Sequence, residues 1–164
     1  MQHQLFLEQL DRQKRETNLV LFGIPDGQES FDGATTDDDK IKKVWTAVEA
    51  DPDRITIRSH RRLGPVINAN RPRPLLVDVE SKSIRDEMLE KSKKLKELQE
   101  NYKKIYIKKD SHPEVRKEWK RLRDAEEVEK NKPSNSGCTI RLDFKQRVLY
   151  KYDIAIDKWR PHPF

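Results

Sequence analysis

The chain has very little cysteine and glycine. Its one cysteine, Cys138, excludes an internal disulfide and suits a reducing compartment. Only five of the 164 residues are glycine, and they form neither a glycine-rich phosphate loop nor a Gly-x-Ser-x-Gly nucleophile elbow. No apolar run approaches the length of a membrane span, and residues 1–15 are too polar for a secretory signal. We therefore expect an intracellular protein, cytoplasmic or nuclear, without a membrane segment.

The sequence also lacks patterns that are typical of catalysis or metal binding. The histidines show no ligand spacing and no His-Glu-x-x-His motif; they are His3, His60, His112 and His162. The acidic run from Asp37 to Asp39 begins a predicted helix, where carboxylates favour the helix dipole. An enzyme fragment would need a metal or acid/base cluster, and none is visible. We expect no enzyme activity, metal or cofactor.

Charge is abundant and unevenly distributed. Charged residues make up 39% of the chain and hydrophobic residues 34%, and the net charge is +6 with a pI of about 9.3. Residues 25–53 hold nine acids and three bases, whereas residues 54–73 hold six arginines and no acid. Residues 82–123 add fifteen bases against eight acids. This pattern favours one small core, a basic face and an anionic partner.

Hydrophobic periodicity predicts an α+β fold. Short apolar or alternating runs indicate strands, and apolar residues at helical spacing indicate helices. The predicted strands are 17–24, 54–63, 75–79 and 105–107, and the helices are 36–49 and 82–98. The order β-α-β-β-α-β is the split βαβ arrangement, an antiparallel sheet with two helices on one face. We assign residues 17–110 to this domain and expect the other sheet face to be open.

Three further segments flank this domain. Residues 1–16 read as a helix, either a coiled-coil remnant or a short surface helix, and about two heptads are too few to hold a stable oligomer. Residues 111–130 form a third helix, in which Ser111 and Glu114 have capping-box spacing. Residues 138–164 form a β-hairpin with a turn near Lys145 and Gln146, followed by an irregular tail from Lys158. We expect a mostly monomeric chain.

Five short motifs follow one another along the chain. They are Leu19-Val-Leu-Phe-Gly-Ile-Pro-Asp26, Arg61-Arg-Leu-Gly64, Arg71-Pro-Arg-Pro-Leu-Leu-Val77, Ile105-Tyr-Ile-Lys-Lys-Asp110 and Val115-Arg-Lys-Glu-Trp119. In this order they resemble the RNA-binding domain of first-open-reading-frame proteins of LINE-type non-LTR retrotransposons (the transposase-22-like family). The likeness covers residues 17 to about 123, and a weaker one to the small C-terminal domain of those proteins covers 140–152.

The resemblance implies an RNA-recognition-type (RRM-like) domain that works with the C-terminal domain to clasp single-stranded RNA. In that family a coiled coil forms a trimer, and the protein coats its transcript as a nucleic-acid chaperone. Here the coiled coil is nearly absent and the C-terminal part is shortened. A homotrimer would therefore require a longer coiled coil in a parent protein. The implied partner is single-stranded RNA or DNA.

The candidate binding residues are cations. RNA-recognition domains usually stack bases on aromatics of the first and third strands, but the predicted slots here are Val20, Pro74, Leu76 and Val79. We therefore expect phosphate contacts and low sequence specificity, leaving Tyr106, Tyr150 and Tyr152 open between base stacking and ordinary packing. The predicted ligands are Arg58, Arg61, Arg62, Arg71, Arg73, Lys108 and Lys109, with Arg116 and Lys117 added by the resemblance. The alternative is a protein-interaction or self-association module that binds no nucleic acid.

Overall fold

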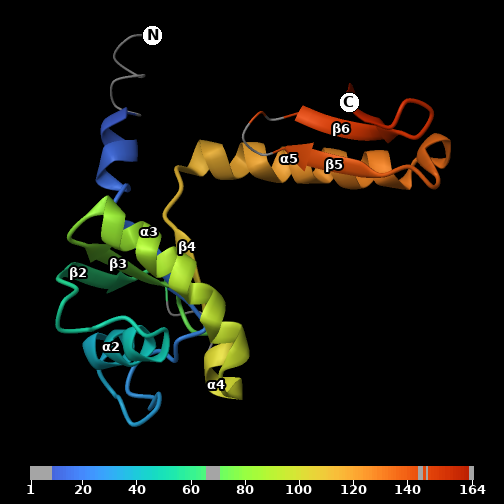
Figure 1. Cartoon of the computed structure of the whole chain (residues 1–164). Helices are drawn as coiled ribbons and strands as arrows, with labels where there is room; N and C mark the ends of the chain where they lie inside the picture. Colours follow the sequence, from blue (N-terminus) through green and yellow to red (C-terminus); the bar gives the residue numbers. More distant parts are fainter. Residues whose placement is uncertain (1–8, 66–70, 144–145, 147, 163–164) are drawn as a thin grey trace. The chain divides into compact units, whose positions relative to one another are not determined.

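The computed structural model describes residues 9–65, 71–143, 146 and 148–162. The chain divides into two units, the first ending at Asp110 and the second beginning at Ser111 (Figure 1). Both combine helices with an antiparallel sheet, so the predicted α+β class is confirmed. Of the N-terminal segment, residues 9–14 are helical, and the first eight residues of the predicted helix lie outside the described part of the chain. No helix among the described residues is long and apolar enough to cross a membrane.

The first unit is built on a four-stranded sheet in which β1 and β3 are central. The strand order is β2-β3-β1-β4, and every described pair is antiparallel. The strands are β1 (Asn18–Phe22), β2 (Ile57–Arg62), β3 (Leu75–Val79) and β4 (Tyr106–Lys109). β1 is rich in consecutive apolar residues because a strand paired on both sides has little contact with water.

Two helical segments connect these strands. Helix α2 (Asp37–Ala47) begins where the Thr36 hydroxyl accepts a hydrogen bond from the Asp39 backbone N–H, as a serine or threonine N-cap does. The predicted single helix 82–98 is wrong, because α3 (Lys82–Lys91) passes into a 3₁₀ helix (Ser92–Glu97) and α4 (Glu100–Lys103) follows. The Ser92 hydroxyl donates to the Leu89 carbonyl at this transition, and the tighter turn buries Leu95.

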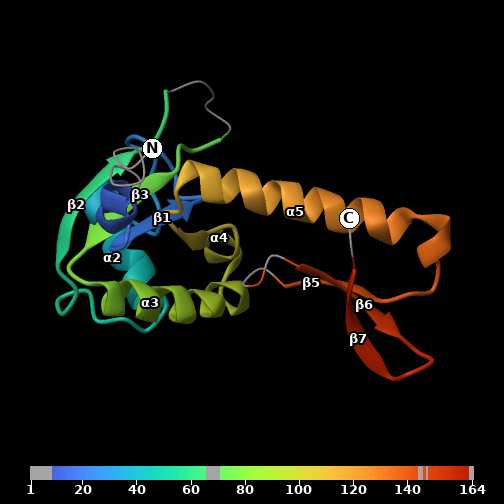
Figure 2. The same cartoon turned by 90° about the horizontal axis from the view of Figure 1, so that it is seen from above.

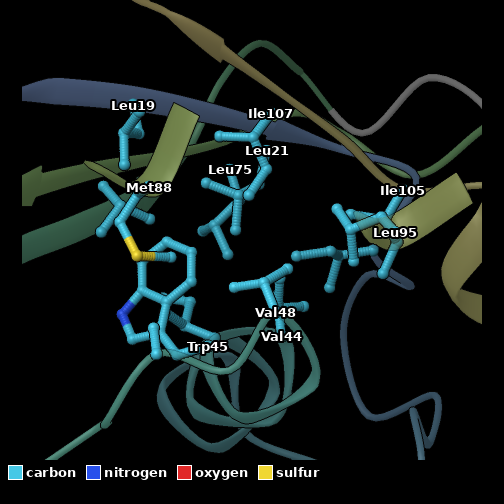
Figure 3. Packing of buried hydrophobic residues seen from close by; sticks show 14 of the residues in the cluster. Leu19, Leu21, Val44, Trp45, Val48, Leu75, Met88, Leu95, Ile105 and Ile107 are labelled. Atoms are coloured by element: carbon cyan, nitrogen blue, oxygen red, sulfur yellow. The ribbon is translucent and has the colours of Figure 1, made fainter. Parts of the chain in front are cut away.

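The core of the first unit lies between one sheet face and these helices. Figure 3 shows Trp45 of α2 and Met88 of α3 pointing toward Leu19, Leu21 and Leu75 of the central strands. All five side chains are fully buried. Because side chains alternate along a strand, these positions define an inner face of the sheet, and their sequence neighbours define an outer face.

The strand register identifies the residues of the outer face. Val20 of β1 pairs with Leu76 of β3 and with Lys108 of β4, and Leu76 pairs with Arg61 of β2. These four side chains therefore form a row across the sheet. Two residues after Val20 on β1, Phe22 pairs with Tyr106 of β4. Tyr106 keeps 49% of its surface exposed.

The second unit contains α5 (Pro113–Asn131) and a three-stranded sheet in the order β5-β6-β7. β5 (Ile140–Asp143) runs beside α5 (Figure 2), β6 is Val148–Asp153 and β7 is Lys158–His162. The hairpin prediction was incomplete, because the tail expected to be irregular forms β7. β7 is an edge strand with mostly exposed side chains and Pro161, so no alternation of apolar residues marks it.

A buried carboxylate stabilises this second unit. Glu129 is 4% exposed and contacts Lys132 Nζ, His162 Nε2 at 2.8 Å and Asn135 Nδ2 at 3.3 Å. The hydrogen bond from Lys132, followed by that from His162, lowers the pKa of Glu129 from its usual 4.5. The ionised carboxylate thus joins the end of α5 to β7.

Glu129→Gln is expected to lower the Tm of the second unit by several degrees at neutral pH, because the paired charge is lost. Since the folded pKa is lowered, Glu129 contributes stability above about pH 4.5 that disappears as the pH falls through the folded value. Thermal unfolding at about pH 7 and about pH 3 should show a smaller acid-induced loss in the variant. Glu127→Gln, an exposed change on the same helix, is the control; equal effects would contradict the role of Glu129.

Candidate functional site

The fold separates the two arginines that are neighbours on β2. Arg61 pairs with Leu76 and lies on the outer face, where it is exposed. Arg62 pairs with Leu75, a core residue, and its side chain is only 6% exposed. Because side chains alternate along a strand, Arg61 lies on the solvent-facing side of the sheet and Arg62 faces the interior.

Arg62 is a structural residue. A guanidinium has five N–H donors, and those of Arg62 reach the Asp37 carboxylate at 2.6 and 3.0 Å and three backbone carbonyls. The carbonyls belong to Ile24, Pro25 and Arg73, at 2.7 to 2.9 Å. The bond from Arg62 also lowers the pKa of Asp37. Because every donor is engaged, Arg62 has none left for a phosphate, and we remove it from the predicted phosphate ligands.

Arg73 has an acidic partner too. Its Nε donates to Asp26 Oδ2 at 2.6 Å and its Nη2 to Asp26 Oδ1 at 3.2 Å. These bonds are the main reason why the pKa of Asp26 falls to about 2. Arg73 retains 28% exposure, so it can still face an anion, but its first role is to hold the segment before β3 against the segment after β1.

Arg61, Arg71 and Lys108 are the predicted cations of the first unit that remain available. Arg61 and Arg71 are exposed, and neither pairs with an acidic side chain within the described ranges 9–65, 71–143, 146 and 148–162. Lys108 lies in the outer-face row with Val20. Its ammonium is 5.2 Å from the centre of the Tyr106 ring and 5.9 Å from that of Phe22, within cation–π range.

An aromatic pair adjoins these cations. The rings of Phe22 and Tyr106 are stacked, with centroids 4.7 Å apart and planes inclined by 7°. The outer face of β1 and β3 carries Val20 and Leu76 where the usual platform has aromatics. The sequence expectation did not consider Phe22, two residues further along the same face of β1. Tyr106, left open at the sequence level, completes the pair from β4. Of the other predicted slots, Leu76 lies on the outer face, but Val79 is fully buried on the inner one.

A pocket of about 710 Å³ opens beside the pair. Its apolar wall comes from the ends of β1 and β2 and the starts of β3 and β4, and Arg71 and Arg73 supply its charge. None of the described lining residues is acidic; they are Phe22, Gly23, Leu63, Pro65, Arg71, Pro72, Arg73, Pro74 and Tyr106. Aromatic, aliphatic and cationic groups thus meet at one end of the outer face.

The other predicted ligands lie elsewhere. Arg58 is at the opposite end of β2, where its Nη2 donates to the Glu80 carbonyl at 2.6 Å. Lys109 pairs with Leu19 and so alternates to the side opposite Lys108. Arg116 and Lys117 lie on α5 in the second unit, and Lys117 pairs with Glu114 at 2.7 Å. Arg58 and Lys109 are therefore not part of the group around the pocket.

Comparisons with known proteins do not identify a family for this chain. No protein-family model matches the chain, and a search of curated proteins gives no match either. Among the described residues, no group of three or more His, Cys, Asp or Glu side chains is arranged to hold a metal ion.

Proposed function

We propose that the first unit is an RRM-like domain that binds single-stranded nucleic acid, RNA above all, with low sequence specificity. The strand order β2-β3-β1-β4 and the packing of α2 and α3 on one face support a split βαβ, ferredoxin-like fold. The observation that carries the function is that Arg71 and Lys108 lie beside the Phe22–Tyr106 pair, with the exposed Arg61 on the same outer face. The resemblance to LINE-type proteins supports a retrotransposon ribonucleoprotein, inside the cell, as its setting.

The chemistry of this face favours a single strand. Arginine and lysine contact phosphates without reading sequence, and aromatic rings stack on bases only when those bases are not enclosed in a duplex. At the other end of the outer face lie Asp78, paired with Asn18, and Asp110. Asp110 is already ion-paired with Arg15, and Asp78 accepts a hydrogen bond from Thr17. Among the described residues, this end therefore offers no available cation to a phosphate, so the bound strand should follow the end that carries Phe22 and Arg71.

The double variant Arg61→Ala, Arg71→Ala is expected to weaken binding to every single-stranded sequence. Each phosphate contact contributes a slope of roughly −0.7 to log K against log salt, so two should flatten the slope by about 1.4. Fluorescence anisotropy with labelled single-stranded RNA at several salt concentrations measures both effects. Stability should barely change, because both side chains are exposed.

The matched control is Lys93→Ala, Lys96→Ala, which removes the same charge from the exposed side of the 3₁₀ helix. It should leave the slope nearly unchanged. Equal effects of the two double variants would show diffuse attraction without a site. If the wild-type chain shows no salt-sensitive binding to RNA, the proposed function is wrong and the rival interpretation, a protein-interaction module, is favoured.

A further inference from the structure

Tyr106, which stacks on the half-buried Phe22, has no evident structural need to be exposed. Core aromatics of the first unit such as Trp45 are fully buried, whereas Tyr106 keeps 49% of its surface exposed on the outer face. Its neighbours are cations and the walls of a pocket, and its ring is already aligned with that of Phe22. An exposed, pre-aligned aromatic surface beside positive charge indicates a planar, anionic ligand.

We infer that this pair and the adjoining pocket hold one unpaired nucleobase of the bound strand, an inference that rests on the proposed function. The base stacks on the aromatic surface, and its phosphate is contacted by Arg71 at the pocket rim and by Lys108. A pocket of about 710 Å³ lies within the roughly 300–1,000 Å³ typical of small-ligand sites. It therefore has room for a whole nucleotide.

The proline-rich wall favours tight binding with little selectivity. Pro65, Pro72 and Pro74 present rigid apolar surfaces, so little conformational freedom is lost when a base enters. The side chains that line the described part of the pocket carry hydrogen-bond donors only on Arg71, Arg73 and the Tyr106 hydroxyl. Stacking tolerates any base because every base has an aromatic face. The site should therefore anchor the strand without reading its sequence.

Abasic oligonucleotides separate stacking from charge. A short single-stranded oligonucleotide and the same strand with its central bases removed carry the same phosphates. For the wild-type chain, base removal should weaken binding about tenfold. Tyr106→Leu, which keeps an apolar side chain but no ring, should lose a similar factor for the intact strand and nothing further for the abasic one. Tyr106→Phe should behave as wild type.

The outcomes distinguish this inference from the proposed function. If intact and abasic strands bind the wild-type chain equally, with normal salt dependence, the stacking site is wrong and the phosphate-binding function stands. If neither strand binds even at low salt, the proposed function fails. Arg61→Ala should weaken both strands by the same factor; a loss confined to the intact strand would contradict the division between stacking and charge. The comparison of two ligands on the wild-type chain requires no variant to fold.

Discussion

Replacing Arg62 with alanine is expected to destabilise the first unit by about 3–5 kcal/mol, the usual effect of removing one member of a buried ion pair. The change leaves the Asp37 carboxylate without its guanidinium partner and deprives the carbonyls of Ile24, Pro25 and Arg73 of their donors. Lysine should not rescue the variant, because a single ammonium cannot reach these acceptors with the geometry of a planar fork. Urea unfolding followed by circular dichroism measures the loss.

Arg61→Ala is the matched control, since it makes the same change one residue earlier. Arg61 is exposed on the outer face, so its loss should alter stability by no more than about 0.5 kcal/mol and should instead weaken RNA binding. The two variants should therefore have different defects: Arg62→Ala in folding and Arg61→Ala in RNA binding. Similar stabilities for both would show that Arg62 is not the buried residue of the pair.

The charge pattern of the sequence was misleading about individual residues. Residues 54–73 contain no acid, so their arginines have no partner nearby in the sequence. In the fold, acids from residues 25–53 lie beside these arginines: Asp37 pairs with Arg62 and Asp26 with Arg73. Sequence composition cannot show which arginines face the interior, because that depends on strand register and on where the loop after β1 returns.

Strand alternation could have separated Arg61 from Arg62 and could have identified Phe22. Phe22 is two residues after Val20, and the side-chain period of a strand is two, so both had to share a face. Its pairing with Tyr106 could not be read in the same way, because it depends on the non-local register between β1 and β4. Elements fixed by local signals, such as the Thr36 cap and the strands β1 and β3, were predicted well.

Helix α5 was predicted, but its N-cap and the strand β7 were not, because both depend on weak or competing local signals. Helix α5 is capped by His112, whose Nδ1 accepts from the Glu114 N–H at 3.2 Å, and not by Ser111. Histidine is not among the preferred caps, so the serine was the reasonable expectation. Strand β7 likewise depends on backbone pairing with β6 rather than on an apolar pattern of its own.

Gly23→Ala is expected to destabilise the first unit by about 3 kcal/mol or more and to abolish the aromatic site. Gly23 follows Phe22 with φ of +84°, a conformation that side chains disfavour. A Cβ there would also lie 2.2 Å from the carbonyl oxygen of Lys104. This contact is with backbone, so relief requires the end of β1 to move away from the start of β4, where Phe22 meets Tyr106.

Gly27→Ala provides the matched control, because Gly27 also has a positive φ, +60°, but no atom within 4 Å of the added Cβ. It should lose only the backbone preference, about 1 kcal/mol, and should retain the difference in affinity between intact and abasic strands. Chemical unfolding of both variants, followed by binding under conditions in which each is folded, tests the argument. The close approach of Gly23 to Lys104 should make its variant the less stable by about 2 kcal/mol. Equal losses would mean that β1 and β4 can separate at this point without cost, and that the alignment of Phe22 with Tyr106 is not held by the backbone.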